Sequence, residues 1–100
     1  MQTISVQELK KRIDAGEKIN LLDVREPSER TEFNIGGVHI PLGKIQAMQA
    51  DEIEGWKNEE VIVYCRSGNR SGMASLFLGQ MGFSNVKNLT GGMLAWREMK

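Results

Sequence analysis

Short apolar runs alternate with helical segments along this chain, and this alternation constrains its fold more than any other feature of the sequence. Apolar runs short enough for buried strands occupy residues 19–24, 38–40, 61–64 and 86–89. Stretches with helical spacing, helix caps or a first-turn proline occupy residues 6–15, 27–33, 45–50, 71–81 and 93–99. Because strands separated by helices pair in parallel, the pattern predicts an α/β fold, with a mainly parallel sheet covered by helices on both faces.

The size and composition of the chain indicate one folded domain. The composition, 40% hydrophobic and 26% charged, is that of an ordinary globular protein rather than a disordered segment. A chain of this mass can bury about 65% of its extended surface on folding. No internal repeat, low-complexity tract or linker interrupts the sequence. We therefore expect residues 1–100 to form a single domain.

The cysteine count and the N-terminal residues restrict the compartment and the kinds of site. The single cysteine excludes an intramolecular disulfide and a zinc site built on paired cysteines, so we expect no metal. Residues 1–5 lack the charged region and following apolar run of a secretory leader. Together these features favour a cytoplasmic protein.

The charges are balanced in number but unevenly distributed. Because 13 Lys and Arg oppose 13 Asp and Glu, we expect neither nucleic acid nor an anionic membrane as a partner. Residues 1–60 nevertheless contain 8 basic and 12 acidic side chains, whereas residues 61–100 contain 5 basic and 1 acidic. No carboxylate side chain occurs from residue 61 to residue 97. This second part of the chain therefore suits a site for a small anion.

A polar loop between a strand and a helix is the strongest candidate for a reactive site. Cys65 directly follows the strand predicted at 61–64 and opens the segment Cys65-Arg66-Ser67-Gly68-Asn69-Arg70, after which Ser71 can cap a helix. Backbone N–H groups of such a loop, together with the positive end of the helix dipole, stabilise an anion and a thiolate. Cys65 is therefore predicted to be a nucleophile that needs no neighbouring general base.

The other residues of this loop, together with Ser71, are predicted to form the site that binds an anionic substrate. Arg66 and Arg70 lie at a helix start, where positive charge is unfavourable unless an anion balances it, and we expect Arg70 to contribute more than Arg66. Ser67, Gly68 and Asn69 are expected to act through their backbone, with Gly and Asn adopting the positive φ that a tight loop needs.

Two charged residues near the end of a predicted buried strand are expected to support this loop rather than to bind substrate. Charged groups in such positions are usually satisfied by one another or by loop amides, and this is the role expected of Asp23 and Arg25. The only histidine, His39, lies within a predicted strand and is expected to be structural.

Four segments spread over nearly the whole chain together resemble the single-domain rhodaneses, which are thiosulfate sulfurtransferases and related sulfur carriers. They are Asp23-Val24-Arg25-Glu26-Pro27, Ile40-Pro41-Leu42, the loop 65–70, and Gly91-Gly92-Met93-Leu94-Ala95-Trp96. The resemblance implies a small domain with about five short strands and no metal or organic cofactor. It also implies that Cys65 accepts a sulfane sulfur as a persulfide, held by the backbone of residues 66–70.

Loop length distinguishes this chain from phosphatases and arsenate reductases, which share the rhodanese fold and have five residues between cysteine and arginine. Here four residues separate Cys65 from Arg70, and Ser71 stands at the phosphatase arginine position. The shorter loop leaves room for sulfur rather than for a tetrahedral phosphate. One departure from the rhodanese pattern is Asn34, which replaces a frequent histidine and bears on the local turn.

Three functions follow from the resemblance. The first is a sulfurtransferase that moves sulfur from thiosulfate or a related anionic donor, through a Cys65 persulfide, to cyanide, a thiol or a protein. The second is a sulfur-carrier or regulatory module for a protein partner, with negligible turnover of small donors. The third is a phosphatase or arsenate reductase, which rests only on the shared cysteine loop.

Overall fold

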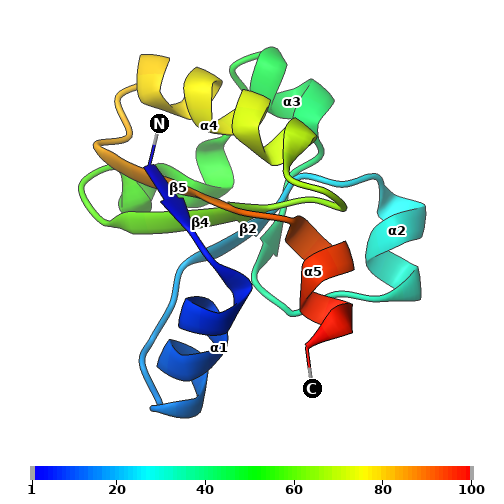
Figure 1. Cartoon of the computed structure of the whole chain (residues 1–100). Helices are drawn as coiled ribbons and strands as arrows, with labels where there is room; N and C mark the ends of the chain where they lie inside the picture. The colour runs from blue at the N-terminus through cyan, green and yellow to red at the C-terminus, as the bar shows by residue number, and fades with distance from the viewer. Residues whose placement is uncertain (1, 100) are drawn as a thin grey trace.

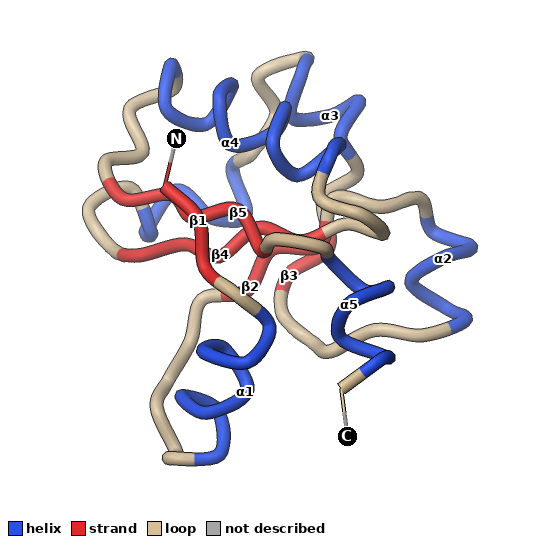
Figure 2. Tube along the Cα trace, viewed as in Figure 1, coloured by secondary structure: helices blue, strands red, loops and turns tan. Residues whose placement is uncertain are grey.

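Short strands, of which the central two are almost continuously buried, build a parallel sheet at the centre of the molecule. The computed structural model describes residues 2–99, and within them five strands pair in the order β1-β5-β4-β2-β3, every neighbouring pair parallel (Figure 2). The strands are β1 (Gln2–Ile4), β2 (Leu21–Asp23), β3 (Val38–His39), β4 (Glu60–Tyr64) and β5 (Asn85–Leu89). The prediction of an α/β fold with a parallel sheet is confirmed.

Helices cover both faces of this sheet. They are α1 (Val6–Asp14), α2 (Pro27–Glu32), α3 (Leu42–Gln46), α4 (Asn69–Gln80) and α5 (Gly92–Glu98), with a 3-10 segment η1 (Asp51–Trp56). Figure 1 shows α3 and α4 on one side of the sheet and α1 and α5 on the other. None of the helices within residues 2–99 has both the length and the apolar character needed to span a membrane.

The alternation of side chains along β4 divides the core into two layers. Val61, Val63 and Cys65 pack with residues of α3, η1 and α4, whereas Ile62 and Tyr64 pack with residues of α1 and α5. Successive side chains of a strand point to opposite faces, so Cys65 continues the β4 pattern toward α4. The Cys65 side chain is therefore placed by the register of the central strand.

Three features of the fold differ from the sequence-based expectations. Strand β1 is absent from the predicted strands because Ile4 is its only buried residue, and its pairing with β5 uses the backbone. Segment η1 is also absent from the predicted elements, since its charged sequence buries only Ile53. The helix predicted at 45–50 lies at Leu42–Gln46 instead, starting after Pro41 and ending before Met48, whose φ of 62° is not helical.

Candidate active site

The candidate site lies where neighbouring parallel strands send their connections in different directions. The chain leaves β2 toward the sheet edge formed by β3, whereas β5, which follows β4, pairs on the opposite side of β4. In open α/β sheets such a switch point at the carboxyl ends of the strands leaves a crevice for ligands. Residues 24–26 follow β2 and the loop 65–68 follows β4, so both predicted groups of site residues meet there.

The thiol of Cys65 is fully buried and has polar contacts with its own loop and with the first turn of α4. The Gly68 backbone N–H lies 3.1 Å from Cys65 Sγ, and Ser71 Oγ lies 3.3 Å from it. Burial raises the pKa of the Cys65 thiol, but the Ser71 hydroxyl and the backbone N–H groups of Ser71, Gly68 and Ser67 outweigh it, so the pKa is lowered overall. The loop therefore favours a thiolate, as its sequence predicts.

The helix after this loop begins earlier than expected. Gly68, with φ of 105°, occupies the N-cap position of α4, and Asn69 is already helical. The predictions that Ser71 caps the helix and that Asn69 adopts positive φ are therefore wrong. Ser71 lies inside the first turn, buried, and its hydroxyl contacts Cys65 Sγ and Asn88 Oδ1.

Asn88 on β5 is a site residue that the sequence reasoning missed. Its Oδ1 accepts a hydrogen bond from Ser71 Oγ, and its Nδ2 donates to the carbonyl oxygen of Gly68 at 3.0 Å. Asn88 pairs in register with Val63, which lies on the α4 face of the sheet. A polar residue on the inner face of a strand is the only sequence signal that could have found it.

The start of α5 holds the other side of the loop. The N–H groups of Met93 and Leu94 donate to the carbonyl oxygens of Cys65 and Arg66, at 2.9 and 3.0 Å. Gly92 permits this contact, because a Cβ atom at this position would lie 2.4 Å from the Cys65 carbonyl oxygen and 2.7 Å from that of Arg66. Its φ of 53° also favours glycine.

A pocket of about 180 Å³ opens between α2, α5 and the loop. Its charged lining includes Arg66 and Arg97, and Arg97 stacks over the ring of Phe33 at 4.9 Å. The remaining lining residues in the described part of the chain are Arg25, Glu29, Glu32, Met93 and Leu94. Cys65 does not line this pocket, but its carbonyl oxygen accepts a hydrogen bond from the N–H of Met93, which does. The pocket thus offers cationic groups beside the loop.

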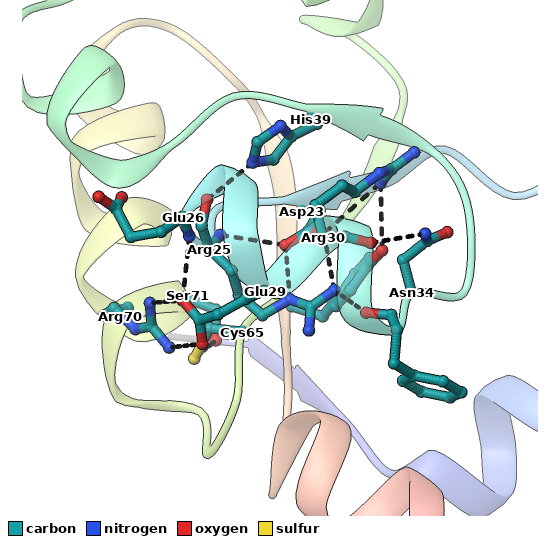
Figure 3. Close-up of polar contacts among 12 residues, drawn as sticks. Asp23, Arg25, Glu26, Glu29, Arg30, Asn34, His39, Cys65, Arg70 and Ser71 are labelled. Atoms are coloured by element: carbon teal, nitrogen blue, oxygen red, sulfur yellow. Dashed lines mark hydrogen bonds and ion pairs between the residues drawn. The ribbon is translucent and has the colours of Figure 1, made fainter.

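The two loop arginines have different environments. Arg70 makes a two-pronged ion pair with Glu29 of α2, with N–O distances of 2.6 and 2.8 Å (Figure 3). Hydrogen bonding to Arg70 lowers the pKa of Glu29 to about 2, and the same bond raises the pKa of Arg70. Arg66 is exposed, and no ion pair involving it is found within residues 2–99. Of the two loop arginines, Arg66 is therefore the one whose guanidinium is exposed and not paired with Glu29.

Asp23 and Arg25 form a buried ion pair near the loop. Arg25 Nε and Nη2 donate to the two carboxylate oxygens of Asp23, each at 2.9 Å, and the Arg25 backbone N–H donates to Oδ1 at 3.0 Å. Arg25 Nη2 also donates to the Phe33 carbonyl oxygen at 2.6 Å. These contacts run to the turn after α2, whereas the prediction expected them to support the Cys65 loop.

His39 and Asn34 have structural contacts around this ion pair, as Figure 3 shows. His39 Nε2 lies 2.7 Å from the carbonyl oxygen of Arg25, which agrees with a structural role. Asn34 Oδ1 accepts from the Gly36 N–H at 2.9 Å, and Asn34 Nδ2 donates to the Arg30 carbonyl oxygen at 3.0 Å. Asn34 thus closes the turn that leads into β3.

Comparisons with known proteins agree with this geometry. The Rhodanese-like domain family model matches residues 5–99. A Bacillus subtilis protein provisionally named a sulfurtransferase, YtwF, is 40% identical over 98 residues, covering 96% of this chain and 90% of that protein. A second B. subtilis protein, provisionally named a sulfur carrier, YrkF, is 40% identical over 94 residues, but these span 93% of this chain and only 49% of that protein.

A solved structure shows the same architecture. A rhodanese-like domain protein from Staphylococcus aureus superimposes with a TM-score of 0.82 at 28% identity, covering 96% of this chain and 91% of that one. The match of fold, loop and family model extends over nearly the whole described chain. The chain therefore belongs to the rhodanese-like domain family.

Proposed function

We propose that this protein is a sulfurtransferase that transfers a sulfane sulfur through a persulfide on Cys65. Family membership and relatives named as sulfurtransferases support sulfur transfer in general. The observation that supports Cys65 in particular is its sulfur atom, which accepts a hydrogen bond from Gly68 N–H and contacts the Ser71 hydroxyl at a site that lowers the pKa of the thiol.

The proposed reaction has two displacement steps and uses no metal or organic cofactor. In the first, the Cys65 thiolate attacks the outer sulfur of thiosulfate, so that a new S–S bond forms while the S–S bond of thiosulfate breaks. Sulfite leaves with the bonding electron pair. In the second, cyanide or a thiolate attacks the outer sulfur of the persulfide, and the electron pair returns to Cys65 as thiolate. The loop N–H groups stabilise negative charge in both steps.

The buried position of Cys65 requires that a donor enter from the exposed side of the loop. Arg66 and Arg97 line the adjacent pocket and provide positive charge for a sulfur anion. Arg70, whose guanidinium is paired with Glu29, instead joins α4 to α2. We therefore propose Arg66, rather than Arg70, as the loop residue that binds the anionic donor.

Incubation with thiosulfate is expected to add the mass of one sulfur atom to the wild-type protein and none to Cys65→Ala. The reason is that Cys65 is the only thiol in the chain. Intact-protein mass spectrometry measures the adduct, and loss of the added mass on treatment with cyanide shows that the sulfur is transferable. Mercaptopyruvate and glutathione persulfide, tested in parallel, distinguish the donor classes. Absence of an adduct with all three donors would contradict the proposal.

Arg66→Ala is expected to raise KM for thiosulfate about tenfold, because a charge-assisted hydrogen bond to the anion is lost. Steady-state kinetics with cyanide as acceptor measure the change. Lys18→Ala is the matched control, since Lys18 is an exposed cation in the segment between α1 and β2. An equal rise of KM in both variants would show that Arg66 contributes only general charge.

A sulfur-carrier role is the second candidate, and the name of the YrkF relative is the observation that favours it. Thiosulfate:cyanide turnover is then expected to be slow compared with direct transfer of the persulfide sulfur to a protein acceptor. Measuring both rates on the same persulfide preparation distinguishes the two roles. Fast turnover with cyanide would argue for the sulfurtransferase.

A further inference from the structure

Both ends of the Asn88 side-chain amide are engaged behind the Cys65 loop. Nδ2 donates to the Gly68 carbonyl oxygen, and Oδ1 accepts from the Ser71 hydroxyl. The reverse orientation would place Oδ1 against the carbonyl oxygen, two acceptors facing each other, so the contacts fix which end of the amide faces Ser71. Asn88 therefore presents only an acceptor to Ser71.

The Ser71 hydroxyl has one proton and two neighbours that can accept it. Asn88 Oδ1 cannot donate, so the hydrogen bond between these residues uses the Ser71 proton. A lone pair of Ser71 Oγ is then available to Cys65 Sγ, 3.3 Å away, and it can accept a proton donated by the neutral thiol. In this arrangement the S–H group of neutral Cys65 has a hydrogen-bond acceptor.

When Cys65 ionises, a hydrogen bond between Ser71 and the sulfur requires Ser71 to be the donor rather than the acceptor. A thiolate can only accept, so a hydrogen bond from Ser71 to sulfur requires the hydroxyl to turn its proton away from Asn88. Asn88 Oδ1 would then lose its donor. Ser71 is fully buried and Asn88 half-buried, so solvent is poorly placed to replace that donor.

We propose that Asn88 is a positioning residue, which competes with the Cys65 thiolate for the single Ser71 proton and thereby sets the balance between the amount of thiolate and its nucleophilicity. The relevance of this balance to sulfur transfer rests on the proposed function. After burial, which raises the pKa of Cys65, the Ser71 hydroxyl is the largest influence on that pKa and lowers it. The acceptor that receives the Ser71 proton therefore affects the ionisation of Cys65.

Charged groups around the loop lie outside this competition. They come from the loop, α4, α2, the end of β2 and α5: Arg66, Arg70, Glu29, Asp23, Arg25 and Arg97. Within residues 2–99, no side-chain hydrogen bond joins any of them to Ser71 or Asn88. Variants at position 88 consequently change the Ser71 proton without removing a charge.

Asn88 could compete for the Ser71 proton or only support the loop, and the change in Cys65 ionisation when Asn88 is removed distinguishes these two roles. If Asn88 only held Gly68 in place, its loss would loosen the N–H group that donates to Cys65 Sγ and would disfavour the thiolate. If Asn88 competes for the Ser71 proton, its loss frees that proton for sulfur and favours the thiolate. The two roles therefore move the ionisation of Cys65 in opposite directions.

The test measures the rate of Cys65 alkylation by iodoacetamide as a function of pH in wild type, Asn88→Ala and Asn88→Val. We expect the pH midpoint to fall in both variants, because the acceptor is removed. The rate is expected to rise about threefold below the midpoint and to fall about threefold on the alkaline plateau, since a less basic thiolate is a weaker nucleophile. Asn88→Asp, which adds negative charge, is expected to raise the midpoint.

Ser71→Ala provides the matched background. Without the hydroxyl there is no proton to compete for, so adding Asn88→Ala to Ser71→Ala is expected to leave the midpoint unchanged. A midpoint that stays constant or rises in Asn88→Ala and Asn88→Val would overturn the inference. An equal fall in the Ser71→Ala background would overturn it as well. Circular dichroism confirms that each variant is folded, and two different residues at position 88 guard against a packing defect in one.

Alkylation does not depend on sulfur transfer, so the two proposals fail separately. A lowered midpoint without a sulfur adduct from any donor would refute the proposed function and leave the role of Asn88 in thiol chemistry intact. A sulfur adduct with an unchanged midpoint would refute the role of Asn88 alone.

Discussion

Asp23→Asn is expected to lower the free energy of unfolding by about 3–5 kcal/mol, because it leaves a buried guanidinium without its counter-charge. The side chains of Asp23 and Arg25 are 0% and 5% exposed, and both carboxylate oxygens accept hydrogen bonds from Arg25. Asp23 Oδ2 also lies 3.5 Å from Arg30 Nη1. A domain of this size has only about 5–15 kcal/mol of stability, so the loss is large. Urea unfolding measures it.

Two comparisons identify the buried charge as the cause. Asp14→Asn breaks the Lys10–Asp14 pair, whose side chains are 51% and 58% exposed, and is expected to change stability by less than about 1 kcal/mol. Asp23→Leu combined with Arg25→Met removes both buried charges and is expected to recover much of the stability lost in Asp23→Asn. Equal losses in Asp23→Asn and Asp14→Asn would contradict the assignment.

Gly92→Ala is expected to destabilise the fold by about 3 kcal/mol and to slow persulfide formation about 100-fold. The added methyl group would lie 2.4 Å from the Cys65 carbonyl oxygen and 2.8 Å from the Arg66 carbonyl carbon, both backbone atoms, so the loop must move. The φ of 53° adds the cost of a left-handed conformation for alanine. Thermal unfolding and single-turnover kinetics with thiosulfate measure the two effects.

Two other glycines separate the causes of that loss. Gly16→Ala has a comparable φ of 82° with nothing within 4 Å of the added atom, so it measures the conformational cost alone, about 1 kcal/mol. Gly79→Ala on α4 also meets nothing within 4 Å and is expected to be stabilising, because alanine favours helix. Normal persulfide formation in Gly92→Ala would show that the loop tolerates the displacement.

The parts of the site that could be predicted from the sequence are those formed by residues close together along the chain. A β-branched run followed by Cys65 and Gly68 predicts a strand, a tight loop and a helix start, and the structure contains all three. The same reasoning predicted a lowered pKa for Cys65, because loop N–H groups are a property of the local backbone. The family resemblance added the roles of these residues.

The parts it missed depend on contacts between distant segments. Asn88 reaches the loop only because β5 pairs with β4, and the Arg70–Glu29 pair only because α2 lies beside the start of α4. Nothing near Arg70 in the sequence distinguishes an arginine that binds substrate from one that binds Glu29. Similarly, β1 forms by pairing with β5, and three residues contain too little apolar pattern to show it.

The contact between α5 and the loop has a consequence for the order in which the site is assembled during synthesis. Met93 and Leu94 supply N–H donors to the carbonyl oxygens of Cys65 and Arg66, and β1 pairs with β5 rather than with an early strand. A nascent chain that has emerged only as far as α4 already contains Cys65 but lacks these partners. The Cys65 loop therefore acquires its native contacts late, after β5 and α5 have left the ribosome and β5 has paired with β4.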